Sequence, residues 1–303
     1  MNIISQIEQL KKKFPKKIYF NQNLSKYSWF NLGGPAKILF KPENLAELTF
    51  FLKKIKGYKK IKVLGAGSNT LIRDGGFDGI IIKLGKAFSR ISLFKKDKII
   101  AGSSALDKNI SNFALENSLS KFEFLSCIPG SIGGGIRMNS GCYGEEISKI
   151  LISVQTVDLN GNVKVIYSPD INFFYRGSNL DENLIFLSAT FKGNKKKKDE
   201  IEKEVINLKS KKEKAQPTKI KTGGSTFKNP IKQTNKKVWE IIKESVPSDI
   251  QFGDAIISDK HANFFINKNN ASFKDMKKLI DFVKEKVNNK TGVKLDLEII
   301  LVE

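Results

Sequence analysis

The chain has 303 residues, of which 40% are hydrophobic and 10% aromatic, and it carries a formal net charge of +22. These values exclude wholesale disorder, and the length predicts two domains or one large domain with a smaller partner. The sequence has no apolar run near the roughly 20 residues that cross a membrane, and its start, MNIISQIEQLKKKF, lacks the apolar core and cleavage site of a signal peptide. We therefore expect a cytoplasmic protein with no membrane segment.

The first third of the chain shows two helical patterns and one pattern of strands. Apolar residues share one face of a short N-terminal helix at Ile3, Ile7, Leu10 and Phe14. Residues 42–56 also follow helical spacing, and they begin with Pro42, a residue favoured in the first turn of a helix. Residues 60–74, KIKVLGAGSNTLIRD, predict a strand, a glycine turn and a second short strand.

The middle of the chain combines a helix with a hairpin. Residues 103–117 predict a helix, and Ser104 stands three residues before Asp107 in a capping pattern. Residues 154–167 predict a β-hairpin, because alternating strands flank the Asn160-Gly161 turn. This mixture favours an α+β fold over an alternating series of parallel strands and helices.

The last third begins with a charged segment and ends in a strand. Residues 193–217 predict a solvated helix or linker that ends at Pro217, the best position for a domain boundary. Ser272 is positioned to cap a helix whose apolar residues are Met276, Leu279, Ile280, Val283 and Val287. Residues 292–303 predict a strand, and on spacing alone Glu298 is an exposed carboxylate at its edge.

Two glycine-rich loops, GAGSN (65–69) and PGSIGGG (129–135), invite comparison with loops that bind phosphate. The second lacks the Gly-Lys-Ser/Thr ending of a P-loop, because Ile136 and Arg137 follow it. The first has Thr70 where a dinucleotide-binding turn needs its last glycine. Tight turns and a close crossing of backbones would explain either loop alone. Two such loops in one domain favour joint binding of a pyrophosphate-bearing ligand.

The positive charge comes mostly from lysine, with 49 Lys and four Arg at positions 73, 90, 137 and 176. Proteins that read bases favour Arg for its bidentate fork, and the lysines here are spread over the whole chain. We therefore expect no nucleic-acid partner, although a lysine-rich nucleic-acid-binding module remains an alternative. Each retained Arg is a candidate for a task that Lys cannot perform.

Cysteine and histidine are too scarce for several common kinds of site. Cys127 and Cys142 make no disulfide framework, and no Cys/His cluster has the spacing of a metal site, so we predict none. His261 is the only histidine, so a Ser-His-Asp triad would have to include it. We interpret His261 as a structural residue.

Seven segments occur in an order shared with one enzyme family. They are SWFNLGGPAKILF (28–40), VLGAGSNTLIRDGGFDGIII (63–82), FLSCIPGSIGGGIRMNSGCYGEE (124–146), FFYRGSNL (173–180), GGSTFKNP (223–230), SDKHANFFIN (258–267) and LDLEI (295–299). Together they resemble UDP-N-acetylenolpyruvoylglucosamine reductase, the MurB family of peptidoglycan synthesis. The chain lacks an inserted tyrosine-bearing loop in its substrate-binding half, and in this it resembles the shorter subclass of that family.

The resemblance implies a two-subdomain FAD-binding fold of the vanillyl-alcohol oxidase and p-cresol methylhydroxylase type, followed by an α+β substrate-binding domain. The implied boundaries are 1–85, 86–212 and 213–303, and the last strand could return to the FAD-binding part. FAD would be bound non-covalently, with NADPH as co-substrate. The implied cofactor-binding residues are Gly65, Ala66, Gly67, Ser68, Asn69, Pro129, Gly130, Ser131, Gly133 and Gly134.

The resemblance also implies the reaction. Reduced flavin would deliver hydride to the enolpyruvyl group of a UDP-sugar after NADPH has reduced it at the same site. Arg176 matches the arginine that grips the substrate carboxylate, Ser225 the serine that supplies a proton, and Glu298 the glutamate near the developing enolate. Asn229 matches a residue that contacts the substrate diphosphate. The product would feed cell-wall biogenesis, cell shape and cell division, and we expect a monomer.

Two positions depart from the family pattern. Cys127 stands where a small residue, often Gly, is usual, and Asp254 stands where Gly is common. A different FAD-dependent oxidoreductase of the same fold is therefore kept as an alternative. Many such oxidases bond their flavin to His or Cys, and the one histidine lies outside the FAD segments.

Overall fold

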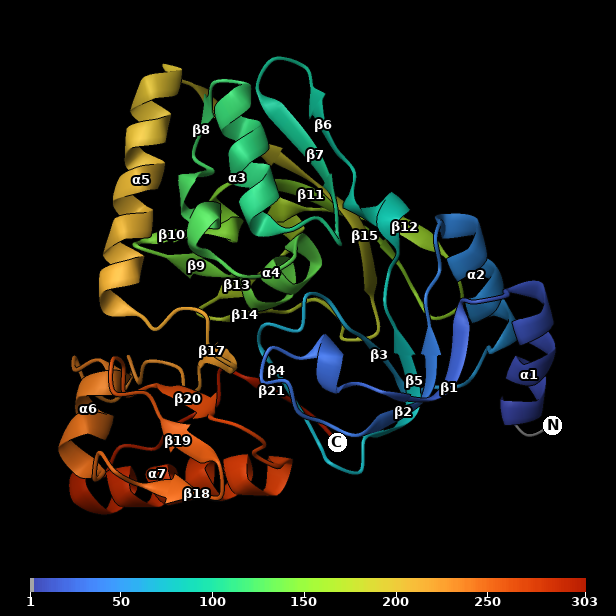
Figure 1. Cartoon of the computed structure of the whole chain (residues 1–303). Coiled ribbons are helices and arrows are strands. Elements are labelled where there is room, and N and C mark those ends of the chain that lie inside the picture. Colours follow the sequence, from blue (N-terminus) through green and yellow to red (C-terminus); the bar gives the residue numbers. More distant parts are fainter. Residues whose placement is uncertain (1–2) are drawn as a thin grey trace. The chain divides into compact units, whose positions relative to one another are not determined.

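The computed structural model describes residues 3–303, and their contacts form two compact units (Figure 1). Unit 1 comprises the described part of residues 1–20, together with residues 38–66 and 79–212. Unit 2 comprises residues 21–37, 67–78 and 213–303. Sequence-based boundaries assigned residues 21–37 and 67–78 to the first subdomain, whereas their contacts are with residues 213–303. The three-part division of the chain stays a prediction.

The first core of unit 1 lies between two helices and a four-stranded sheet of order β1-β2-β5-β3. The elements are α1 (Ile3–Lys13), α2 (Leu45–Lys54), β1 (Ile18–Asn23), β2 (Pro35–Phe40), β3 (Ile61–Val63) and β5 (Phe77–Ile82). Ile7 and Leu10 of α1 are buried, which confirms the apolar face predicted for that helix. The rings of Phe40 and Phe51 stack at 4.0 Å between centroids, so β2 and α2 pack through aromatic contact.

The start of α2 differs from its prediction. The helix begins at Leu45 and not at Pro42, because Asn44 adopts an extended conformation and its side chain accepts the Glu47 N–H. An Asn at this position satisfies a backbone donor that the first turn of the helix leaves without a partner.

The second core of unit 1 is built on a five-stranded antiparallel sheet of order β12-β11-β15-β7-β6. The strands are β6 (Ile91–Phe94), β7 (Lys98–Gly102), β11 (Leu151–Val157), β12 (Val163–Tyr167) and β15 (Ile185–Lys192). The hairpin predicted over 154–167 is confirmed, since Val154 pairs with Ile166 and Gly161 turns the chain with a φ of +85°. The helices of this part are α3 (Asp107–Glu116), α4 (Ile132–Met138) and α5 (Lys198–Ala215).

Ser104 does not cap α3 as predicted. The helix begins at Asp107 after Leu106, with no capping side chain. Ser104 instead donates its hydroxyl to the Leu84 carbonyl at 3.3 Å, which directs it toward another segment of unit 1.

Short pairs of strands and 3-10 turns connect the larger elements of unit 1. The strand pairs are β8 (Leu119–Ser120) with β16 (Asn194–Lys195), β9 (Gly141–Cys142) with β10 (Glu145–Glu146), and β13 (Phe173–Phe174) with β14 (Gly177–Ser178). The 3-10 turns are η2 (Lys86–Ser89), η3 (Glu123–Cys127), η4 (Ile147–Lys149) and η5 (Ser168–Asp170).

Unit 2 contains a four-stranded antiparallel sheet of order β17-β20-β19-β18, with α6 and α7 packed together beside it (Figure 1). The elements are η1 (Ser25–Tyr27), β4 (Thr70–Ile72), β17 (Thr222–Ser225), α6 (Val238–Ser245), β18 (Gln251–Phe252), β19 (Ala255–Ile257), β20 (Phe264–Asn267), α7 (Phe273–Thr291) and β21 (Ile300–Val302). The capping role predicted for Ser272 is confirmed, because its hydroxyl accepts the Asp275 N–H. All five apolar residues predicted to face inward from this helix are buried.

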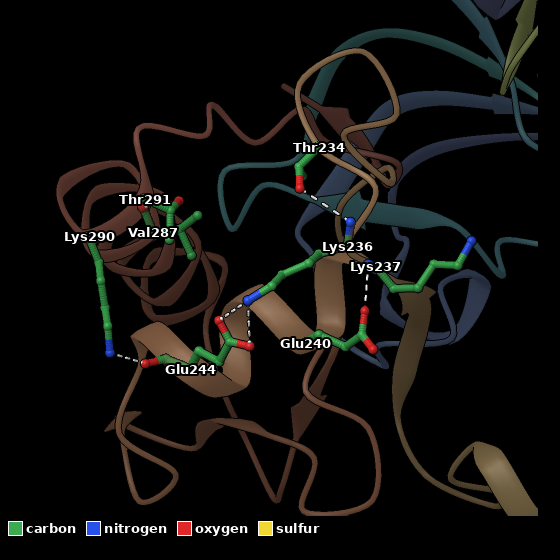
Figure 2. Close-up of polar contacts among 8 residues, drawn as sticks. All are labelled: Thr234, Lys236, Lys237, Glu240, Glu244, Val287, Lys290 and Thr291. Carbon is green, nitrogen blue, oxygen red and sulfur yellow. Dashed lines mark hydrogen bonds and ion pairs between the residues drawn. The ribbon is translucent and has the colours of Figure 1, made fainter.

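Polar contacts fix the start of α6 and connect α6 to α7 (Figure 2). The Glu240 carboxylate accepts the Lys237 N–H at 2.7 Å, which satisfies a donor at the start of α6. Lys236 pairs with Glu244 at 2.8 Å, and the Lys290 ammonium of α7 donates to the Glu244 carbonyl. These contacts lie at the surface, so each contributes little to stability.

The closing strand is shorter than predicted. Only Ile300–Val302 forms β21, which pairs in parallel with β4, and an isolated bridge joins Leu297 to Phe227 upstream. Val293, Leu295, Ile299 and Val302 of this segment are buried, whereas Leu297 and Leu301 are half-buried. Glu298 is half-buried, so its interpretation as an exposed edge carboxylate is wrong.

Candidate active site

The first glycine loop follows β3, and Gly65 at its start and Gly67 at its centre make different contacts. In unit 1, the Lys83 ammonium donates to the Gly65 carbonyl at 2.7 Å. In unit 2, Gly67 has a φ of +72°, and a Cβ there would lie 1.8 Å from the Tyr27 carbonyl oxygen. Gly67 is therefore required by a close crossing of backbones, the structural alternative that the sequence left open.

The second glycine loop packs closely against its neighbours in unit 1. A Cβ at Gly130 would lie 2.6 Å from Asp107 Oδ2, and one at Gly133 would lie 3.1 Å from the Cβ of Ser103. The Gly133 N–H also donates to the Ser103 carbonyl at 2.8 Å. These glycines let the start of α4 approach α3 and the segment after β7.

The two loops meet at Ser131. A Cβ at Gly65 would lie 2.7 Å from Ser131 Oγ, so only glycine fits at Gly65 without movement. Both residues line a cavity of about 340 Å³ in unit 1. Of the predicted cofactor-binding residues, Gly65, Ala66 and Ser131 line it. The cavity thus unites two glycine loops that lie more than sixty residues apart in the chain.

The cavity carries more positive than negative charge. Lys41, Lys83 and Lys86 line it together with one carboxylate, Glu43. Burial lowers the pKa of Lys83, and repulsion from Lys41 lowers it further. Such an excess of cations attracts an anion, because a bound negative charge offsets the desolvation of Lys83 and its repulsion from Lys41.

Arg176 occupies a strained turn of unit 1. β13 and β14 are joined by Tyr175 and Arg176, and Arg176 has a φ of +56°, a conformation that favours glycine or asparagine. A Cβ at Gly177 would lie 2.2 Å from the ring of Phe174, so a larger residue there would displace that exposed ring. A non-glycine residue held in this conformation is frequent at functional sites.

The Arg176 guanidinium already has two neighbours. Its Nη2 donates to the Gly141 carbonyl at 3.0 Å, and its centre lies 5.0 Å from the centroid of the Tyr175 ring. Both contacts orient the planar group.

Ser225 and Glu298 are brought together in unit 2. Ser225 ends β17 opposite Phe264, after Gly224 with a φ of +77°. The next residue, Thr226, accepts the Glu298 N–H at 2.9 Å, so the two segments run side by side. Asn69 completes this cluster by donating its side-chain amide to the Glu298 carbonyl at 2.8 Å. Arg176, the third predicted catalytic residue, belongs to unit 1.

Asn229 has a structural contact in unit 2. Its Oδ1 accepts the Val238 N–H, the first backbone donor of α6, at 3.0 Å. The predicted contact of Asn229 with a diphosphate stays a prediction.

His261 has a structural environment, as interpreted from the sequence. It packs against the rings of Trp239 and Phe264, and its Nδ1 accepts the Asn263 N–H at 3.3 Å. Burial lowers the pKa of His261, which favours the neutral ring. Among residues 3–303, no group of three metal-ligating side chains could hold a metal ion, and no helix is long and apolar enough to cross a membrane.

Comparison with known proteins assigns the chain to a family. Residues 36–167 match the family model of an FAD binding domain, and residues 216–302 match that of the C-terminal domain of UDP-N-acetylenolpyruvoylglucosamine reductase. The chain is 58% identical over 300 residues to the UDP-N-acetylenolpyruvoylglucosamine reductase of Pelagibacter ubique, covering 99% of each chain. It is 44% identical to the enzyme of Rickettsia conorii, covering 91% of this chain and 92% of that protein. The chain belongs to the UDP-N-acetylenolpyruvoylglucosamine reductase family.

A solved structure of this MurB family supports the fold. The chain is similar to the crystal structure of MurB from Thermus caldophilus, with a TM-score of 0.82 and 28% identity over 95% of this chain and 98% of that chain. The predicted α+β fold, with an FAD-binding part and a C-terminal domain of the MurB type, is confirmed.

The cavity of unit 1 fits the diphosphate of FAD. A Cβ at Gly65 would intrude on Ser131, and the lysines around these residues supply positive charge. The cavity is also lined by three residues that the sequence did not identify as candidates for cofactor binding: Lys83, Lys86 and Ser104. The two lysines could not be distinguished among 49, and Ser104 was interpreted as a helix cap.

The two departures from the MurB pattern occupy defined places. Asp254 follows Gly253 in the β18–β19 turn and accepts the Asn270 N–H at 3.0 Å, so it anchors a neighbouring loop of unit 2. Cys127 is buried at the end of η3, directly before the second glycine loop.

Proposed function

We propose that this chain is a flavoenzyme that uses FAD and NADPH to reduce the enolpyruvyl group of UDP-N-acetylenolpyruvoylglucosamine to UDP-N-acetylmuramate. The observation that carries the proposal is the 58% identity to a reductase of that name over 99% of both chains. The glycine-walled cationic cavity agrees with it, because a flavin dinucleotide needs a site for its diphosphate.

The cofactor-binding residues proposed here are the ones assigned from the sequence. Gly65, Ala66 and Ser131 would hold the diphosphate, with Lys83 as a cation beside them. When bound, the flavin accepts hydride from NADPH and supplies it to the enolpyruvyl double bond. The chain's own part is to orient the ring and to stabilise the charge that develops on the substrate.

Arg176 is proposed to bind the substrate carboxylate. A guanidinium forms two parallel hydrogen bonds to a carboxylate, whereas an ammonium acts as a point charge. The strained turn and the contact with Gly141 hold this group in one orientation. Negative charge that spreads into the carboxylate during hydride addition would be stabilised by Arg176.

Ser225 and Glu298 are proposed to complete the reaction. The Ser225 hydroxyl would supply the proton to the carbanion-like carbon, which is a strong enough base to deprotonate a weak acid that is held in place. Glu298 would act near the enolate in its protonated form or paired with a cation, because a bare carboxylate would repel the developing charge. Asn229 would contact the substrate diphosphate.

The cellular setting is part of the same proposal. The reaction would take place in the cytoplasm, where its product would supply peptidoglycan precursors and so serve cell shape and cell division. The enzyme would act as a monomer with no nucleic-acid partner.

Flavin absorbance tests the proposal directly. The purified protein should be yellow, should lose its colour with NADPH and should recover it on addition of UDP-N-acetylenolpyruvoylglucosamine, with UDP-N-acetylmuramate detected by mass spectrometry. A folded, colourless protein that takes up no FAD would contradict the proposal. Flavin that stays attached after acid denaturation would favour another oxidoreductase of this fold, and salt-sensitive DNA binding without colour would favour the nucleic-acid alternative.

A further inference from the structure

The two cysteines of the sequence, fifteen positions apart, lie side by side in unit 1. Cys127 ends η3, and Cys142 lies in β9, which packs against η3. The Cys142 Sγ donates to the Phe124 carbonyl of η3 at 3.4 Å, and Phe124 lies three residues before Cys127 in the same 3-10 helix. The fold therefore places both sulfur atoms at the contact of these two segments.

The surroundings of Cys127 favour its thiolate. The neighbouring Cys142 thiol is the largest influence and lowers the pKa of the Cys127 thiol to about 6, while burial opposes this shift. Ser126 Oγ lies 3.7 Å from the Cys127 sulfur, and the positive charges of Lys212 and Lys209 on α5 act in the same direction. The Lys212 ammonium also donates to the Cys127 carbonyl at 2.6 Å, so this cation is held beside the thiol.

Cys142 is suited to a different part in the pair. The neighbouring Cys127 thiol raises the pKa of the Cys142 thiol most, and burial raises it further, so Cys142 is the thiol of the pair that favours its protonated form. Arg176 and Lys212 are the charged groups that act on Cys142 in the opposite direction. An ionised thiol beside a protonated one is the arrangement of a reactive dithiol, in which one sulfur attacks an oxidant and the other resolves the product.

We propose that Cys127 and Cys142 form a peroxide-sensitive dithiol that closes reversibly into an intramolecular disulfide. The Cys127 thiolate attacks a hydroperoxide, the O–O bond breaks, and the sulfur keeps one oxygen as sulfenic acid while the alcohol or water leaves with a proton. The Cys142 sulfur then attacks the Cys127 sulfur, an S–S bond forms, and water leaves with the thiol proton. The peroxide is reduced, the two thiols are oxidised, and a thiol reductant reverses the closure.

Closure would affect the neighbouring functional elements. Gly141, directly before Cys142, provides the carbonyl that accepts the Arg176 guanidinium, and Ile128, directly after Cys127, leads into the second glycine loop. An S–S bond is about 2.05 Å long, shorter than any non-bonded contact between two sulfur atoms, so one segment has to move on closure. We expect slower turnover in the oxidised form. That consequence rests on the proposed function, whereas the thiol chemistry does not.

Thiol counting on the flavin-loaded protein tests the dithiol without an activity assay. After treatment with hydrogen peroxide and denaturation, a thiol reagent should find no free thiol, and the intact mass should fall by that of two hydrogens. Dithiothreitol should restore both thiols. Two free thiols after treatment, a disulfide-linked dimer, or sulfonic acid as the sole product would each overturn the proposal.

Single variants assign the two sulfurs. In Cys142→Ser, dimedone should trap a sulfenic acid at Cys127. In Cys127→Ser it should label Cys142 at least about tenfold more slowly, because burial still raises the pKa of the Cys142 thiol and a protonated thiol is a poor nucleophile. Equal labelling of both variants would reject the assigned roles. Lys212→Met should slow the labelling of Cys127, and a circular dichroism spectrum like that of the wild type identifies variants that remain folded.

Discussion

Asn69 donates its side-chain amide to the main-chain carbonyl of Glu298, and the two residues are separated by 229 positions in the sequence. This hydrogen bond of 2.8 Å joins the end of the first glycine loop to the segment that leads into the last strand of unit 2. The Ile300 N–H donates to the Asn69 carbonyl at 2.9 Å, so Asn69 contacts that segment on both sides of Ile299. Asn69 therefore positions Glu298 as well as ending a glycine loop.

Removing this side chain should loosen the Glu298 segment. We expect Asn69→Ala to lower the free energy of unfolding by about 1 kcal/mol, the usual value of one hydrogen bond, and to lower turnover as well. Chemical denaturation followed by circular dichroism and steady-state kinetics measure the two effects. Asn289→Ala, at an exposed site near the end of α7, is the matched control: it should leave turnover unchanged and should not lower stability, because Ala favours a helix more than Asn does. Unchanged turnover in a destabilised Asn69→Ala would show that the bond serves the fold alone.

Arg176 and Arg137 are two arginines of unit 1 with different expected roles. Arg137 uses its fork to donate to the carbonyls of Leu180, Asp181 and Leu184 at 2.8–3.0 Å. Arg137→Lys should therefore lose stability, because an ammonium cannot satisfy three carbonyls in one plane. Arg176→Lys should keep the fold and the flavin but lose turnover by a barrier on the order of a few kcal/mol.

Kinetics and denaturation on both variants separate these roles. The Arg176 assignment predicts a fall in kcat/KM with an unchanged midpoint of unfolding, and the Arg137 assignment predicts the reverse. Near-normal kcat/KM in Arg176→Lys would show that this arginine is a structural residue.

The sequence predicted the elements whose signals are local. The helix after Ser272 was found from a cap and its apolar spacing, and the 154–167 hairpin from alternation around Asn160-Gly161. Helix starts were less certain, because Pro42 and Ser104 satisfied a local rule while Asn44 supplied the actual cap of α2. Where a rule has two candidates a few residues apart, the final packing selects between them.

The site was predicted only as far as its motifs extend. Both glycine loops were identified, but their meeting at Ser131 depends on contacts between distant segments. The cations of the cavity could not be identified, since Lys83 and Lys86 have no local pattern that distinguishes them from other lysines. The burial of the Asp107 carboxyl could not be predicted either, because Asp is a common residue in the first turn of a helix.

Asp107 predicts a pH-dependent stability. It is fully buried in unit 1, neither carboxyl oxygen has a hydrogen-bond partner among the described residues, and burial raises its pKa from 3.8 to about 8. The folded state therefore holds a proton that the unfolded state releases above pH 3.8. The stability contributed by the neutral carboxyl is fully present below this value, is lost as pH rises toward 8, and changes no further above it.

The variant Asp107→Asn should remove this dependence. Near pH 4 the variant and the wild type should have similar free energies of unfolding. Between pH 4 and pH 8 the difference between them, variant minus wild type, should grow by up to about 1.4 kcal/mol per pH unit. Denaturation curves at four or five pH values measure the difference. Parallel profiles for the two proteins would show that Asp107 is ionised in the folded state.

Ser225 predicts a separation of the two half-reactions. If its hydroxyl only supplies a proton to the substrate carbon, it has no part when NADPH reduces the flavin. Stopped-flow absorbance of Ser225→Ala should show bleaching by NADPH at nearly the normal rate. Recovery of colour with UDP-N-acetylenolpyruvoylglucosamine should be slower by roughly 10²–10⁴-fold, the usual contribution of a general acid.

The outcome of this experiment also tests Glu298, whose N–H bonds to the residue after Ser225. Equal slowing of both half-reactions would mean that Ser225 shapes the site and does not donate the proton. Normal rates in both would make the 223–230 loop a cradle for phosphate and transfer the acid role to Glu298 or to a water molecule. Glu298→Gln then decides between these two, because glutamine keeps the hydrogen-bonding shape of a protonated carboxyl but cannot give up a proton. A rate in Glu298→Gln as fast as that of the wild type would leave water as the acid.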